Sequence, residues 1–137
     1  MKVHTTNYKN AFIEIADDCP VKVGEMPPLK GDKKTVANLQ FDMLYEHPYE
    51  YTSDDVFFGV YAIRNEIKKS EQKAARAEFF SKGQPCMRTS PLTKRYGWGV
   101  HSDAEGRIAI YPCESAEYQR FSKDKKLQVV KAMKTSR

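Results

Sequence analysis

The four residues at 103–106, Asp-Ala-Glu-Gly, constrain the fold more than any other short stretch of this chain. Asp at the first position and Gly at the fourth are typical of a type I turn. The flanking segments 97–102 and 107–112 are rich in residues that favour strands. We therefore predict a β-hairpin in which Val100 lies opposite Ile110.

This register divides the hairpin into two faces. The large apolar side chains share one face, which we expect to be buried: Trp98, Val100, Ile108 and Ile110. The opposite face, called here the glycine face, carries Arg95, Gly97, Gly99, His101, Ala109, Tyr111 and Cys113. Glycine inside a strand leaves no side chain to pack, so we expect something to approach the sheet closely there.

Two interpretations of the glycine face stay open at this point. In the functional one, a small polar or anionic ligand, or a protein partner, binds there, with Arg95 as anion anchor, His101 as a titratable hydrogen-bonding group and Tyr111 as a wall. The candidate ligand-binding residues are Arg95, Gly97, Gly99, His101, Tyr111 and Cys113. In the structural one, a helix of the protein itself packs against the glycines, or a bulge bends the strand.

Patterns for catalysis or metal binding are incomplete. Gly97 and Gly99 are not followed by a third glycine at 102, so the phosphate-binding pattern G-x-G-x-x-G fails. The three histidines lack the spacing of metal ligands, and we expect no metal and no cofactor. An enzyme alternative would use His101 as general acid or base beside Tyr111 or Cys113, and it requires an open cleft between them.

Residues 51–67 form the clearest helical pattern. Thr52 or Ser53 can cap its first turn, and Asp54 and Asp55 favour the positive end of the helix dipole. An apolar stripe then follows at helical spacing, which predicts the central core helix: Val56, Val60, Ile63 and Ile67.

The other elements follow from shorter patterns. Residues 11–16 indicate a strand, and the Pro- and Gly-containing stretch 19–34 an ordered connector. Residues 36–45 fit helix and strand spacing, and we favour a helix capped by Thr35. Further helices are expected from Ser70 to about Phe80, over 114–124 and over 125–134.

Charge and cysteine content limit the class of protein. Six of the 23 basic residues but only one of the 18 acidic residues lie in 123–137, so the rest of the chain is neutral by count. We interpret residues 123–137 as a basic helix or tail that keeps the protein soluble, with weak nucleic-acid binding as the alternative. The three cysteines form no C-x-x-C pair, and no signal peptide or long apolar run is present. We expect a cytoplasmic protein with reduced thiols and no membrane association.

Four segments resemble an uncharacterised family of small bacterial and fungal proteins, domain of unknown function 6157. They are HTTNYKNAFIEIADDCP (4–20), HPYEYTSDDVFFGVYAIR (47–64), FFSKGQPC (79–86) and SPLTKRYGWGVHSDAEGRIAIY (90–111). The resemblance implies a shared fold and brings no functional residues. It draws attention to the polar HTTNY segment, which we interpret as an ordered N-terminal arm whose Thr and Asn side chains hold turns.

The sequence as a whole predicts a single α+β domain over residues 1–137, with a small antiparallel sheet containing the hairpin and three or more covering helices. The function we expect is non-catalytic binding at the glycine face. The oligomeric state is left open, homo-oligomers included.

Overall fold

A computed structural model describes residues 3–135. The helices are α1 (Val36–Leu44), α2 (Ser53–Arg64), α3 (Gln72–Phe79), α4 (Pro91–Lys94) and α5 (Ala116–Lys123). The strands are β1 (Ala11–Glu14), β2 (Tyr51–Thr52), β3 (Trp98–Ser102), β4 (Arg107–Pro112) and β5 (Gln128–Lys131). Within the described residues the strands form one sheet in the order β2-β4-β3-β1-β5. The α+β class predicted from the sequence is confirmed.

The hairpin has the predicted register. Val100 pairs with Ile110, and Trp98 pairs with Pro112. The turn closes because the Gly106 N–H donates to the Asp103 carbonyl over 3.1 Å, while Gly106 takes a φ of 83°. Trp98 and Val100 are buried on one face, and His101 lies on the other.

The predicted helix over 125–134 is wrong, because this segment contains β5. Val129 and Val130 lie beside Phe12 and Ile13 in a parallel pairing with β1, which makes the sheet mixed rather than purely antiparallel. The spacing of Leu127, Val130 and Met133 fits a helix. The adjacent β-branched residues Val129 and Val130, however, favour a strand, and they pack against the clusters on opposite faces of the sheet. The preceding helix, α5, forms as predicted.

The two early helices begin where the sequence predicts. Thr35 caps α1 and Thr52 caps α2, each in a reciprocal capping box with the residue three positions later. The stripe on α2 is only partly correct, because Val56 and Val60 are buried whereas Ile63 is 56% exposed. Near the end of α2, Ile63 therefore lies outside the core, although Ala62 beside it is buried.

The helix predicted from Ser70 begins later. A 3₁₀ turn over Lys69–Glu71 precedes α3, and no side-chain cap marks its start. Helix α4, capped by Ser90, was not predicted. Strand β2, which pairs with β4, was not predicted either.

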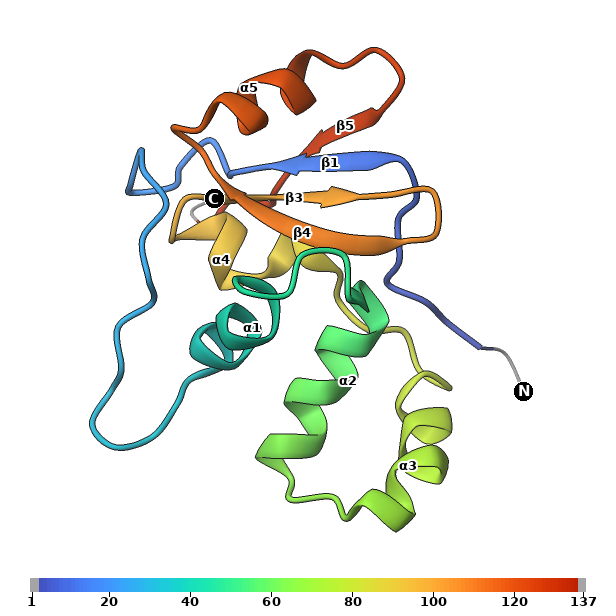
Figure 1. The fold of residues 1–137 in the computed structure, drawn as a ribbon. Coiled ribbons are helices and arrows are strands. Elements are labelled where there is room, and N and C mark those ends of the chain that lie inside the picture. The colour runs from blue at the N-terminus through green and yellow to red at the C-terminus, as the bar shows by residue number, and fades with distance from the viewer. Residues whose placement is uncertain (1–2, 136–137) are drawn as a thin grey trace.

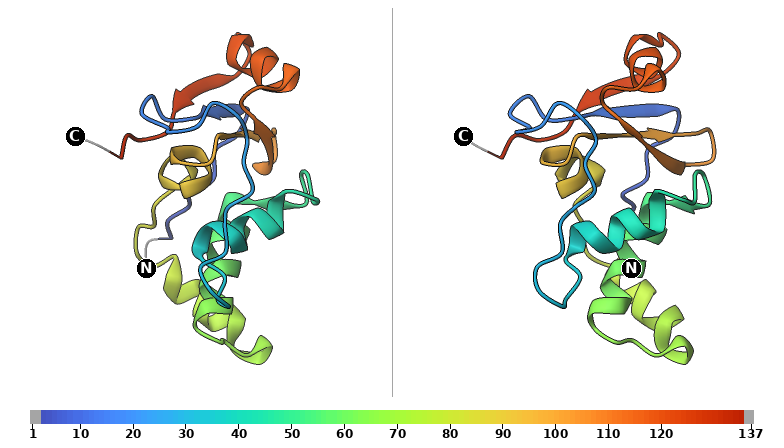
Figure 2. Two further views of the ribbon diagram at one scale, coloured as in Figure 1. Left: turned by 90° about the vertical axis from the view of Figure 1, so that its left-hand side faces the viewer. Right: turned by 60° about the vertical axis from the view of Figure 1, so that its left-hand side comes forward.

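The sheet separates two apolar clusters of unequal size. Helices α1, α4 and the first half of α2 cover the face of Trp98 and Val100, and α5 covers the opposite face (Figure 1). The end of α2 and all of α3 project from this body on the side away from α5 (Figures 1 and 2). We call residues 58–84 the helical arm. No helix in the described part of the chain has the length and apolar character needed to cross a bilayer.

Candidate functional site

The glycine face of the hairpin lies against α5. Tyr118 of α5 and Phe12 of β1 occupy the space above Gly99, where a β-carbon would lie 2.6 Å from an atom of each ring. The Tyr118 hydroxyl accepts a 2.9 Å hydrogen bond from the Ile15 N–H, and burial raises the pKa of Tyr118 to about 12. At Gly99 the structural interpretation therefore holds, because a helix of the protein itself makes the close approach.

The connector covers Gly97. This residue has a φ of 81°, and a β-carbon there would lie 2.2 Å from the carbonyl oxygen of Val23. Both facts require glycine at this bend between α4 and β3. Neither glycine thus offers an open surface to a ligand.

His101 and Tyr111 are joined through a third residue, Tyr49, in the loop before β2. The Tyr49 hydroxyl oxygen lies 2.8 Å from His101 Nδ1 and 2.9 Å from the Tyr111 hydroxyl oxygen. The imidazole stacks on Phe121 of α5, with ring centroids 4.1 Å apart and planes at 13°. Burial lowers the pKa of His101 and raises the pKa of Tyr49, which favours the uncharged form of both groups near neutral pH.

These contacts form a packed polar network rather than an open acid–base pair. Tyr49 has a φ of 60°, a conformation that is rare for an aromatic residue, and its N–H donates to the Ile108 carbonyl over 2.9 Å. The enzyme alternative needs an open cleft beside His101. Instead, Tyr49 lies between His101 and Tyr111, and Phe121 covers the imidazole.

The two remaining candidates lie elsewhere. Cys113 is buried, and burial raises the pKa of its thiol, which disfavours the nucleophilic thiolate. Arg95 lines a separate hollow of about 380 Å³ together with Asp18, Pro20 and Thr135. The six residues predicted as a site therefore do not line one common cavity.

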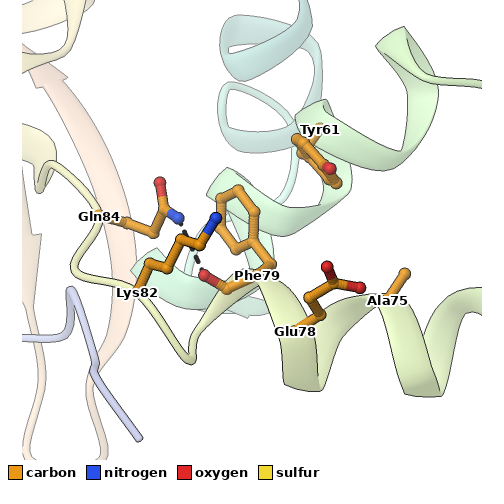
Figure 3. A pocket seen from close by; sticks show the side chains of 6 residues that line it. All are labelled: Tyr61, Ala75, Glu78, Phe79, Lys82 and Gln84. Atoms are coloured by element: carbon orange, nitrogen blue, oxygen red, sulfur yellow. Dashed lines mark hydrogen bonds between the residues drawn. The ribbon is translucent and has the colours of Figure 1, made fainter.

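A different cavity, of about 330 Å³, lies in the helical arm between α2 and α3 (Figure 3). Its lining residues are Tyr61, Ala75, Glu78, Phe79, Lys82 and Gln84. The rings of Phe79 and Tyr61 lie 4.7 Å apart between centroids and give the cavity an aromatic side. Figure 3 shows Lys82 and Gln84 on one side of Phe79, and Glu78 on the other.

Two opposite charges line this cavity without neutralising each other. Glu78 and Lys82 are four residues apart, a spacing that favours an ion pair on a continuous helix. Helix α3, however, ends at Phe79, so Lys82 lies beyond it. Among the ion pairs of residues 3–135, none involves Glu78 or Lys82. Both charges can therefore meet a ligand.

Arg76 of α3 links the helical arm to the first turn of α2. The Arg76 guanidinium donates to Asp55 Oδ1 over 2.9 Å and lies over the rings of Phe58 and Phe80. Burial would raise the pKa of Asp55, but the Thr52 N–H and Arg76 together outweigh it and lower that pKa. These contacts position α3 against α2 and so shape the cavity.

The model of a family of unknown function, DUF6157, matches residues 3–137. The chain belongs to this family. No curated protein and no solved structure matches the chain. The family brings no functional residues, and the geometry of the chain's own cavities is the basis for a functional proposal.

The family segment HTTNY lies against the start of α2. The Thr5 hydroxyl and the Thr6 N–H donate to the two oxygens of Asp54, over 2.7 and 2.6 Å. The Asn7 side-chain oxygen accepts from the Asp54 N–H over 2.9 Å. This N-terminal segment is thus ordered, and its polar side chains hold the first turn of α2 in place.

The basic C-terminal segment is not one helix: Lys123 ends α5, Lys131 ends the edge strand β5, and Lys125, Lys126 and Lys134 lie outside both elements, while Arg137 lies outside the described residues. The Lys131 ammonium contacts the Asp17 carboxylate, which lowers the pKa of Asp17. Strand β5 is the outermost strand beside β1. A lysine on an edge strand discourages pairing with another chain, and this role of Lys131 requires no nucleic-acid partner.

Proposed function

We propose that the protein is a non-catalytic binding domain for a small zwitterionic ligand, and that this ligand occupies the α2–α3 cavity. The observation that carries the proposal is the pair of unneutralised charges, Glu78 and Lys82, on either side of an aromatic surface. The polar ligand class expected from the sequence is kept. The glycine face is not proposed as the site, because Tyr118 and Phe12 fill the space above Gly99.

The lining groups match the parts of a free apolar amino acid. The Lys82 ammonium can bind a carboxylate, and the Glu78 carboxylate can bind an ammonium group. The rings of Phe79 and Tyr61 can contact an apolar or aromatic side chain. The Gln84 amide N–H already donates to the Phe79 carbonyl over 2.9 Å, which leaves its carbonyl oxygen as an acceptor.

The affinity is expected to be modest, because both charges are exposed to solvent. Each exposed charge pair contributes up to about 1 kcal/mol, which corresponds to roughly a fivefold change in Kd.

The proposal includes the cytoplasmic location expected from the sequence, since all three cysteines are free thiols.

The test compares L-phenylalanine with two analogues, each lacking one charge. Phenethylamine lacks the carboxylate, and 3-phenylpropionate lacks the ammonium group. We expect both analogues to bind about fivefold more weakly than phenylalanine in a chemical-shift titration. Lys82→Gln should weaken binding of phenylalanine and phenylpropionate but not of phenethylamine. Glu78→Gln should weaken binding of phenylalanine and phenethylamine but not of phenylpropionate.

Matched controls are available in the same segment. Lys73→Gln and Glu71→Gln remove exposed charges that do not line the cavity, and they should leave all three affinities unchanged. The proposal fails if no saturable shifts appear around α2 and α3. It also fails if the single-charge analogues bind as tightly as phenylalanine.

A further inference from the structure

The C-terminal end of α1 carries negatively charged side chains, whereas the C-terminus of a helix favours positive charge. Asp42 lies in the last turn, Glu46 follows two residues after the helix ends at Leu44, and the last turn contains no basic residue. The carbonyl groups at a helix C-terminus already create a partial negative charge, which is stabilised by cations. Two carboxylates at this end therefore concentrate negative potential.

An aromatic surface adjoins these carboxylates. The rings of Phe41 and Tyr45 stack with centroids 4.8 Å apart, and Trp98 packs edge-on against both, at 5.4 and 5.6 Å. Phe41 and Trp98 are buried, whereas Tyr45 is 52% exposed. The face of an exposed aromatic ring attracts cations through its quadrupole.

The carboxylates and the aromatic surface meet in a cavity of about 210 Å³. The connector closes one side through Met26, and the remaining lining residues come from α1 and the turn after it: Phe41, Asp42, Tyr45 and Glu46. Two hydrogen bonds of 2.8 Å hold the connector there, from Trp98 Nε1 to the Glu25 carbonyl and from Asn38 Nδ2 to the Pro27 carbonyl. The wall opposite α1 is therefore anchored on both sides of Met26.

The charges of this cavity are only partly balanced. Lys34 Nζ lies 2.6 Å from Asp42 Oδ2, in a solvent-exposed pair. Within residues 3–135, Glu46 takes part in none of the ion pairs. One carboxylate beside the aromatic surface thus lacks a cation.

We propose that this cavity binds a small organic cation of the alkylammonium class, with quaternary ammonium groups as the best fit. The helix end, the Glu46 carboxylate and the Tyr45 ring all favour positive charge, and Met26 offers apolar contact to methyl groups. This site is separate from the α2–α3 cavity and needs no anionic group on its ligand. The two proposals can fail independently.

Trp98 is the only tryptophan in the chain, and its ring touches Tyr45 and Phe41, so its fluorescence reports on the cavity. The probe is choline chloride, titrated at constant ionic strength against sodium chloride. The uncharged comparison is 3,3-dimethylbutan-1-ol, which has the same shape without the positive charge. We expect saturable quenching or a spectral shift with choline, and binding at least fivefold weaker with the alcohol.

Two variants measure how much the carboxylate and the aromatic ring contribute to choline binding. Glu46→Gln should weaken choline binding by roughly two- to fivefold, and Tyr45→Leu by a similar factor. Glu105→Gln, an exposed carboxylate in the hairpin turn, is the control and should not change the affinity. Circular dichroism and Tm of each variant show whether the fold is intact.

Three results would overturn the proposal. They are an unsaturable response equal to that of sodium chloride, equal affinity for choline and the alcohol, and an unchanged choline affinity in folded Glu46→Gln.

Discussion

The sheet and the helical arm use apolar side chains in different ways. In the sheet, Val100 and Ile108 are fully buried, with helices on both faces. In the arm, α3 has no buried residue, and Ile63 at the outer end of α2 is 56% exposed. Most of the stability should therefore come from the sheet, while the arm keeps unpaired charges and aromatic surface available for binding.

The largest expected difference in unfolding free energy is between two Ile→Ala substitutions, one in the sheet and one in the arm. Ile108→Ala removes a fully buried side chain from the sheet and should lower the free energy of unfolding by about 2–5 kcal/mol. Ile63→Ala removes a mostly exposed side chain and should change it by no more than about 0.5 kcal/mol. Urea denaturation of both variants measures the contrast. Comparable losses would show that the arm is as tightly packed as the sheet.

A pair of glycines gives the next largest effect. Gly99→Ala places a methyl group against Phe12 and Tyr118, and overpacking of this kind costs about 1–3 kcal/mol. Gly83→Ala in the arm places a methyl group 3.9 Å from the nearest atom, His4 Nδ1, and should be nearly neutral. Thermal or urea unfolding distinguishes them. A neutral Gly99→Ala would mean that α5 does not press on the sheet.

The hairpin could be predicted because its information is local. A turn with Asp103 and Gly106 fixes the register, and alternation then assigns Trp98 and His101 to opposite faces. The sequence even indicated a close approach at Gly97 and Gly99. It could not identify the approaching groups, because Val23 and Tyr118 are distant along the chain.

Features that depend on tertiary contacts could not be predicted. The apolar spacing of β5 fits a helix, and only its pairing with β1 decides for a strand. The α2–α3 cavity depends on α3 ending at Phe79, which separates Glu78 from Lys82. The cluster of Tyr49, His101 and Tyr111 joins three distant segments.

The smallest effect expected concerns the pH dependence contributed by the sheet. Burial lowers the pKa of His101 in the folded protein, so the unfolded chain, with a pKa near 6.5, takes up a proton first as the pH falls. The stabilising contribution is complete above that value and is lost progressively as the pH falls towards the folded pKa.

His101→Phe keeps an aromatic ring against Phe121 but cannot titrate, so it should flatten this part of the curve of unfolding free energy against pH. Asp55→Asn, in the first turn of α2 where Arg76 of the helical arm is bound, is the comparison. Its carboxyl pKa is lowered from 3.8, so its contribution is lost only when the pH falls below that range, and the slope near pH 6.5 should persist. An unchanged slope in His101→Phe would show that the imidazole is not desolvated by α5, and that the helix covers the sheet less closely there than at Gly99.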